Sequence, residues 1–353
     1  MTGGAKPLLQ DAMAPPNASC CAAAVQSSRK PGRFLPQTIA HRGYKASFPE
    51  NSMGAFRGAA EVGAHAIETD LHLSADGVVD PSLKRCFGID RKIRDCTWEY
   101  LSGLETVREP RQGMPRLSDL LEWLAEAGNE HIWILLDVKV DDGPDALLGA
   151  VARTVKDAPP SKTPWDQRII LGLWNATFIA AARRLLPSHP MVLICFHLPY
   201  AGHFFEVANL GFNILRESLV GPCGSRFLRR ARDADRPVMA WTVNDERWME
   251  WCIRKNAAAK RGPEATTTIA TTTKLIDGVI TDDPRLFLEV CKRWEDEQDG
   301  VAVSRPARRE GVGGRVRSLV RLLAFPVVVR FLFLLGRWRG KFDYFTNVKR
   351  LER

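Results

Sequence analysis

The chain has 353 residues, enough for one large domain or two modest ones, and its hydrophobic fraction of 45% and charged fraction of 26% are typical of a globular protein. Eight cysteines, irregularly placed and without a pair at zinc-ligand spacing, exclude a disulfide scaffold and favour a reducing, intracellular setting. The net charge of +9 comes from the tail, since the chain from Val301 onward carries thirteen Lys/Arg and three Asp/Glu, so we expect no nucleic-acid-binding groove on the body.

The first 35 residues are rich in Ala, Pro, Gly and Ser and lack the continuous apolar core of a signal peptide. Asp11 and the prolines also make a poor amphipathic transit helix. This composition predicts a disordered segment over residues 1–35, with a targeting segment as the alternative.

From residue 36 to residue 295, short apolar runs alternate with stretches of helical spacing such as "NSMGAFRGAAEVGA" and "RLSDLLEWLAEAG". Near-continuous apolar strands that alternate with helices predict a parallel sheet covered on both faces, and eight such units predict an α/β fold of the (β/α)8 TIM barrel type. The eight expected strands are "TIAHRG", "AIETDL", "IWILLDVKV", "RIILGLW", "MVLICFHL", "FNILRES", "PVMAWTVN" and "LIDGVITDDP".

Charged side chains stand at the carboxyl ends of these strands, where this fold places its chemistry. Glu68 and Asp70 are two apart on one strand and share a face, and Asp137 ends the next strand along the chain. Three carboxylates suit a hard divalent cation, Mg²⁺ or Ca²⁺, and not zinc. Polar residues also begin wherever strands end, but this cluster predicts an ion that organises phosphate chemistry.

Three further side chains at the strand ends suit a phosphate substrate. Arg42 can hold two phosphate oxygens through its planar guanidinium, Lys139 can supply a point charge, and His41 is the candidate proton carrier. Each alone could be a salt bridge or a core histidine, but together with the three carboxylates they predict a phosphodiester-cleaving site.

The segments "IAHRGYKASFPENSMGAF", "GAHAIETDLHLSADG", "LLDVK", "WTVN" and "DGVITDDP" resemble the glycerophosphodiester phosphodiesterase family in order and spacing, from Thr38 to Cys291. The closest resemblance is to the fungal phosphatidylglycerol phospholipase C branch. It implies a barrel that hydrolyses a phosphodiester with a divalent metal. The catalytic residues it implies are His41, as the acid/base, and Arg42, which binds the phosphate. It also implies phosphate or substrate binding at Glu50, Lys139 and Trp241, and metal coordination at Glu68, Asp70 and Asp137, where the last is often Glu in the family.

The hairpin after Asp70 departs from the family pattern. The family continues the Asp76-Gly77 turn with a longer apolar arm that ends in His-Asp, whereas here "DGVV" runs directly into "DPSLKR" and about four residues, including the second histidine, are absent. His72 shares a face with Asp70, so one hypothesis is that it takes over the role; an exposed hairpin histidine is the alternative. A gene-model error is a third explanation, which the transcript sequence across codons 76 to 85 tests.

Three segments lie outside the barrel pattern: a low-complexity surface loop over Asn256 to Lys274, a polar linker over 296–317 and a basic, apolar tail over 318–353. Arg321, Pro326 and Arg330 interrupt the apolar part of the tail, so we expect no comfortable spanning helix. Its basic flanks favour association with an anionic membrane surface, and a C-terminal helix packed on the barrel is the alternative.

The sequence therefore predicts an intracellular, membrane-associated hydrolase of glycerophospholipids, with the endoplasmic reticulum, lipid droplets and mitochondria not distinguished. The expected reaction converts phosphatidylglycerol to diacylglycerol and glycerol phosphate. The alternatives are a soluble glycerophosphodiester phosphodiesterase and a non-catalytic protein that binds anionic lipid head groups.

Overall fold

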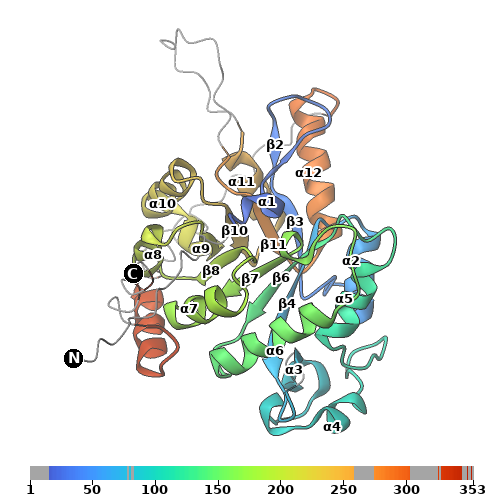
Figure 1. Cartoon of the computed structure of the whole chain (residues 1–353). Coiled ribbons are helices and arrows are strands. Elements are labelled where there is room, and N and C mark those ends of the chain that lie inside the picture. The colour runs from blue at the N-terminus through green and yellow to red at the C-terminus, as the bar shows by residue number, and fades with distance from the viewer. Residues whose placement is uncertain are drawn as a thin grey trace, which may run out of the picture.

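The computed structural model describes residues 16–77, 79–80, 83–257, 274–302, 325, 327–343, 348 and 351. Within them, eight parallel strands form a barrel that closes where the first strand pairs with both the second and the last (Figure 1). The order of the strands around the barrel follows the chain, which confirms the predicted (β/α)8 TIM barrel. The strands are β3 (Gln37–His41), β4 (Ala66–Leu73), β6 (Trp133–Val138), β7 (Ile169–Leu173), β8 (Met191–Cys195), β9 (Gly211–Leu215), β10 (Val238–Trp241) and β11 (Gly278–Thr281).

Helices connect the strands and pack on the outside of the barrel (Figure 1). In the first of these, α2 (Met53–Glu61), Ser52 caps the first turn by accepting a hydrogen bond from the backbone of Ala55 at 3.2 Å, and Phe56 and Ala59 are buried. The other helices are α3 (Leu83–Phe87), α4 (Trp98–Ser102), α5 (Leu117–Ala125), α6 (Pro144–Asp157), α7 (Ala176–Leu185), α8 (Leu198–His203), α9 (Arg216–Leu219), α10 (Gly221–Asp233), α11 (Glu246–Lys255) and α12 (Pro284–Gln298). Outside the barrel order lie α1 (Ser19–Ala22), β1 (Val25–Gln26), β2 (Phe34–Leu35) and β5 (Val79–Asp80).

Residues 18–24 cover the amino-terminal end of the barrel, and the residues after them pair with the end of α12 through Arg29 and Arg33. Gln37 donates hydrogen bonds to two carbonyl oxygens of this segment, at 2.7 and 2.8 Å, and Asp277 accepts one from its backbone at 3.1 Å. Ala18 and Ala22 are fully buried against the residues that fill the barrel interior. Within the segment expected to be disordered, residues 16–35 therefore pack on the barrel, because small side chains such as Ala18 and Ala22 suit the barrel floor. The first fifteen residues lie outside the described residues.

The C-terminal segment packs on the barrel. The chain is helical over 327–338, beside α7 and α8 (Figure 1), and Phe333 and Phe342 are buried there. Packing on the barrel is the arrangement that the sequence offered as the alternative to association with a membrane. Most of the predicted surface loop and linker, and part of the tail, lie outside the described residues. Within the described part of the chain, no helix is both long and apolar enough to cross a membrane.

Candidate active site

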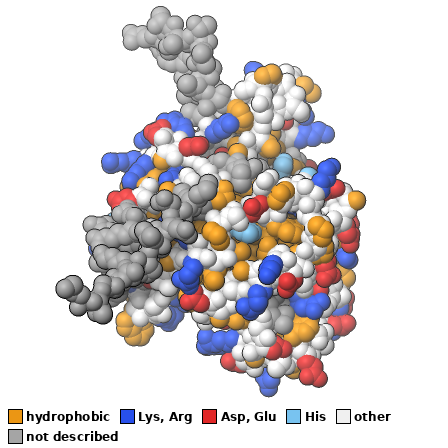
Figure 2. All heavy atoms as spheres, in the orientation of Figure 1, with side chains coloured by type: hydrophobic (Ala, Val, Ile, Leu, Met, Phe, Trp, Pro, Cys, Tyr) orange, Lys and Arg blue, Asp and Glu red, His pale blue; other side chains and the backbone are white. Residues whose placement is uncertain are grey.

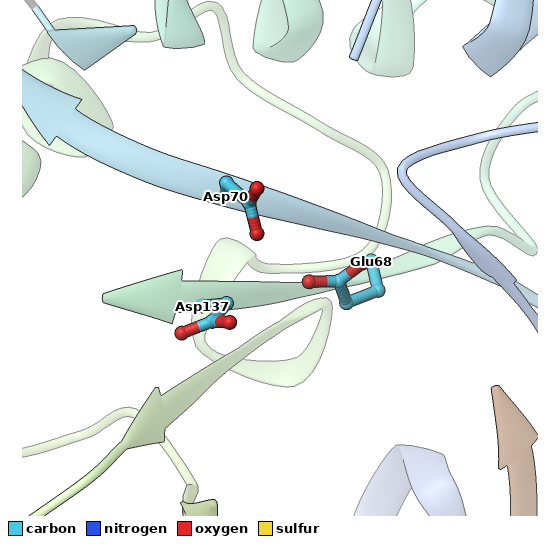
Figure 3. Close-up of side chains that lie close together, drawn as sticks. All are labelled: Glu68, Asp70 and Asp137. Carbon is cyan, nitrogen blue, oxygen red and sulfur yellow. The ribbon is translucent and has the colours of Figure 1, made fainter. Parts of the chain in front are cut away.

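Three carboxylates meet at the carboxyl ends of β4 and β6 (Figure 3). Glu68 and Asp70 share a face of β4, and Asp70 is in register with Asp137 on β6. One oxygen from each residue lies within 4.8 Å of an oxygen from each of the others. All three residues are buried, with exposed fractions of 4%, 1% and 7%. The structure thus brings together the three residues predicted to hold a metal.

Two cations lie closest to these carboxylates. Lys139 Nζ lies 2.7 Å from one oxygen of Asp70 and also contacts Asp137, while Arg42 Nε lies 2.9 Å from the other oxygen of Asp70. Burial alone would raise the pKa of Asp70, but Lys139 and Arg42 hold it below its usual value. Burial raises the pKa of Glu68 to about 7, and the neighbouring carboxylates add to the rise.

This charge arrangement fits a divalent cation. Glu68, Asp70 and Asp137 offer only oxygen donors, and Arg42 and Lys139 balance two of their three negative charges when all are ionised. The raised pKa of Glu68 reflects the cost of keeping the third charge in a buried place. A hard divalent ion would remove that cost, so the residues present suit such an ion.

The turn after β3 carries two predicted site residues to the cluster. Arg42 and Gly43 both have left-handed backbone, with φ of 56° and 79°. A side chain at Gly43 would lie 2.6 to 2.7 Å from atoms of Ala55, so the turn can approach α2 only with glycine. The turn directs the backbone N–H of Arg42 to Glu68, at 3.0 Å, and its guanidinium to Asp70. Backbone strain of this kind is common at functional sites.

His41 lies between the carboxylate cluster and the end of the last strand. Its Nδ1 is 2.6 Å from Asp282 Oδ1, and its Nε2 is 3.9 Å from Glu68 Oε2. Asn244 donates to the second oxygen of Asp282 at 2.8 Å. Asp282 therefore fixes the ring so that Nε2 faces the cluster. Asp282 lies in the expected strand "LIDGVITDDP" and received no role from the sequence, although barrel closure, which sets β11 beside β3, was the signal for this contact.

The carboxylate of Glu50 contacts three cationic side chains. Its Oε1 accepts hydrogen bonds from Arg42 at 3.1 Å and from Arg85 at 2.8 Å, and Lys45 lies 3.3 Å from Oε2. Burial alone would raise the pKa of Glu50, but Arg42 and Arg85 hold it below its usual value. Arg85 also lies 3.5 Å from Asp70. Glu50 thus positions the guanidinium groups beside the cluster; Arg85, the last residue of "PSLKR", received no role from the sequence.

Two tryptophans stand beside Asp137. Trp174 donates a hydrogen bond from its indole to Asp137 Oδ1 at 2.7 Å. Trp241, a predicted substrate-binding residue, packs edge-to-face on Trp174 with 6.1 Å between ring centroids and donates to the carbonyl oxygen of Asn213 at 3.0 Å. Trp174, the last residue of the expected strand "RIILGLW", received no role from the sequence, and it links Trp241 to the cluster.

β4 continues past the cluster into the shortened hairpin. Gly77 turns the chain with a φ of 85°, and β5 adds two residues that pair with Leu73 and His72. His72 Nδ1 lies 3.4 Å from Asp142, which follows β6 and also accepts a hydrogen bond from the backbone of Leu73. The contact gives His72 a place in holding the hairpin to the rim, and its role in proton transfer stays a hypothesis.

Known proteins resemble the chain in sequence and in fold. It is 22% identical over 271 residues to a glycerophosphodiester phosphodiesterase of Caldanaerobacter subterraneus subsp. tengcongensis, covering 72% of this chain and 97% of that protein. It is 32% identical over 139 residues to a lysophospholipase D of Homo sapiens, covering 36% of this chain and 43% of that protein.

Two solved structures share the fold. A glycerophosphodiester phosphodiesterase from Parabacteroides distasonis superposes with a TM-score of 0.59 at 21% identity, covering 74% of this chain and 99% of that one. A phosphodiesterase from Oleispira antarctica, in complex with the product sn-glycerol-3-phosphate, superposes with a TM-score of 0.56 at 18% identity. The superposition covers 73% of this chain and 97% of that one.

A comparison with protein families matches residues 41–286 to the glycerophosphoryl diester phosphodiesterase family. The match spans more than half of the chain, and it contains His41, the three clustered carboxylates and the cations around them. The chain belongs to the glycerophosphoryl diester phosphodiesterase family, whose members are metal-dependent phosphodiester hydrolases.

Proposed function

We propose that this family member hydrolyses a glycerophospholipid at a membrane surface, converting phosphatidylglycerol to diacylglycerol and glycerol phosphate. The observation that carries the lipid substrate is an apolar C-terminal helix, residues 327–338, at the rim that holds the carboxylate cluster. The similarity to a lysophospholipase D supports a lipid substrate. The resemblance of the motifs to the fungal phospholipase C branch supports this particular head group and bond.

The residues of the cluster divide the chemistry among them. Glu68, Asp70 and Asp137 would hold Mg²⁺ or Ca²⁺, which when bound supplies charge neutralisation and polarisation at a phosphate oxygen. Arg42 and Lys139, both in contact with Asp70, supply positive charge for the remaining phosphate oxygens. These five side chains position the phosphodiester and stabilise the charge that develops during its cleavage.

Proton transfer falls to His41. Because Asp282 holds Nδ1, Nε2 is the nitrogen that exchanges a proton with the substrate. The family resemblance implies a second histidine at the end of the hairpin, and this chain has lost it. Removal of one proton-transfer group costs about 10²–10⁴-fold in rate, so we expect turnover well below that of a two-histidine enzyme.

A soluble glycerophosphodiester is the second candidate substrate. The relative from Caldanaerobacter subterraneus is named for this activity, and the Oleispira antarctica structure contains sn-glycerol-3-phosphate as the product. A phosphodiester without acyl chains would need the same cluster but not the apolar helix at the rim. The two candidates therefore differ in what the C-terminal segment contributes.

The test uses the purified full chain with Mg²⁺ or Ca²⁺ on two matched substrates, phosphatidylglycerol in mixed micelles and its deacylated form, glycerophosphoglycerol. We expect diacylglycerol release, abolished by EDTA and lowered about 10²–10⁴-fold by His41→Ala. Turnover of glycerophosphoglycerol alone would establish the soluble substrate instead. Lipid binding without turnover of either substrate would contradict the proposal and support a head-group binding protein.

A further inference from the structure

The C-terminal helix is apolar on two opposite faces. Val329 and Phe333 lie on the inner face and are only 7% and 6% exposed. The outer face follows the i, i+4, i+7, i+11 spacing of a single helical stripe, and its side chains have exposed fractions of 69%, 64%, 53% and 82%. The residues of this outer stripe are, in that order, Val327, Phe331, Leu334 and Trp338.

The inner face fixes the helix to the barrel. Phe333 stacks on the ring of His197 with 4.2 Å between centroids and packs against Tyr200 at 5.1 Å. Phe342, after the helix, packs against Tyr200 at 5.6 Å. These contacts hold the helix in one orientation, so the outer stripe is a defined feature of the surface and not a loosely attached segment.

The same segment reaches the rim of the active site. Lys341 Nζ lies 3.3 Å from Asp141 in the loop after β6, and the Lys341 carbonyl oxygen accepts a hydrogen bond from Asn175 at 3.1 Å. Asn175 directly follows Trp174, whose indole bonds Asp137 in the carboxylate cluster. The outer stripe is thus attached within a few residues of the predicted metal ligands, on the same end of the barrel.

Basic side chains lie beside the stripe. By the helical period, Arg330 and Arg337 lie along one edge of it. The other edge carries two further exposed apolar residues, Val328 and Leu332, and leads to Arg339 just after the helix. Arg330 and Arg339 are exposed. Figure 2 shows orange side chains projecting at the lower left, where the C-terminal helix lies in Figure 1. A large exposed apolar surface with arginines beside it is the pattern of a helix that lies in the plane of a membrane interface.

We propose that the outer stripe inserts into the surface of an anionic bilayer and thereby holds the barrel mouth at the lipid head groups. The arginines beside the stripe favour anionic lipid. They also disfavour a second copy of the chain, because a symmetric face-to-face contact would bring the same arginines together. This inference deepens the proposed function, since it identifies the surface by which a lipid substrate would be reached.

The test measures co-sedimentation of the full chain with vesicles, separately from catalysis. We expect at least tenfold stronger partitioning onto vesicles of phosphatidylcholine with about 30% phosphatidylglycerol than onto phosphatidylcholine alone, because of the arginines beside the stripe. The triple variant Phe331→Ser, Leu334→Ser, Trp338→Ser should lose at least tenfold of this partitioning. Arg330→Gln with Arg339→Gln should lower binding to the anionic vesicles and leave binding to neutral vesicles nearly unchanged.

The matched control is Val107→Ser with Val301→Ser, which removes two valines that are 59% and 76% exposed away from the C-terminal helix. This control should bind vesicles like the wild type. Unchanged vesicle binding by the triple variant would overturn the proposal. The proposal would also fail if the wild type were a dimer and the triple variant a monomer with the same lipid binding, because the stripe would then be a dimer interface. Turnover of glycerophosphoglycerol should be equal in the wild type and the triple variant. Vesicle binding through the stripe without any turnover would reject the proposed function and leave the docking surface standing.

Discussion

At the amino-terminal end of the barrel, the carboxylate of Asp277 accepts hydrogen bonds from the backbone of Ala24 and of Val238, at 3.1 and 2.8 Å. At the carboxyl-terminal end, Asp137 instead contacts the side chains of Lys139 and Trp174. The first aspartate satisfies backbone groups that would otherwise be buried without partners. The second is balanced by side chains, whose contacts a metal or a substrate can replace. One end of the barrel is therefore built for stability and the other for exchange of partners.

Asp-to-Asn substitutions of equal size test this comparison, and the largest effect is expected at Asp137. The amide oxygen of Asp137→Asn can still accept the hydrogen bond from Trp174, but the negative charge that a metal needs is lost. Loss of several kcal/mol of metal-assisted stabilisation corresponds to about 10³-fold in kcat. Kinetics with saturating Mg²⁺ or Ca²⁺ and calorimetric metal titration measure it.

The control for Asp137→Asn is its stability in EDTA. Lys139 keeps its ion pair with Asp70 in the variant, so the cost of roughly 3–5 kcal/mol for an unpaired buried charge does not arise, and urea unfolding should match the wild type closely. A variant that unfolds much more easily would mean that this end of the barrel also depends on its carboxylates for folding, and the comparison would fail.

Asp282→Asn should have an intermediate effect on activity. Asp282 contacts His41 Nδ1 at 2.6 Å, and the asparagine can present an N–H there, which favours the wrong tautomer or ring orientation. We expect kcat to fall about 10–100-fold, as is typical for a residue that orients an active side chain. Asp282→Glu should recover part of the loss. If Asp282→Asn also lowered the free energy of unfolding enough to account for the whole fall in kcat, the role of Asp282 would be structural alone.

Asp277→Asn should lower the stability of the fold and leave activity unchanged, the reverse of what is expected for Asp137→Asn. An amide offers one oxygen where the carboxylate uses both, so one backbone N–H of Ala24 or Val238 loses its acceptor and faces a second donor. A buried unsatisfied group of this kind costs about 1–3 kcal/mol in the free energy of unfolding. Urea titration measures this loss, and kcat of the folded protein should stay unchanged. A large fall in kcat would show that the two ends are coupled.

The sequence predicted the carboxylate cluster because Glu68, Asp70 and Asp137 follow from local rules. Alternation along a strand puts Glu68 and Asp70 on one face, and consecutive parallel strands place Asp137 beside them. The contact of His41 with Asp282 joins residues 241 positions apart, on the first and last strands of the barrel, and depends on barrel closure. No local sequence pattern reports such a long-range contact, so Asp282 was not assigned to His41.

The two chain ends show where composition misleads. Residues 16–35 read as disordered because Ala, Pro and Ser carry little hydrophobic pattern, yet Ala18 and Ala22 are fully buried at the barrel floor. In the tail, the apolar run predicted a lipid-facing helix and left packing on the barrel as the alternative. The structure gives the same helix an inner face buried through Val329 and Phe333 and an outer apolar face that is exposed.

The smallest effect is expected at His72, where the hairpin meets the rim. Its ring lies 3.4 Å from Asp142, and Asp142 keeps its hydrogen bond with the backbone of Leu73 when the ring is removed. We expect His72→Ala to change kcat by less than about threefold and the free energy of unfolding by no more than about 1 kcal/mol. Proton transfer would make the loss far larger, about 10²–10⁴-fold, with a changed pH profile. Such a loss would identify His72 as the substitute for the missing histidine, and the carboxyl-terminal rim would then hold two proton carriers instead of His41 alone.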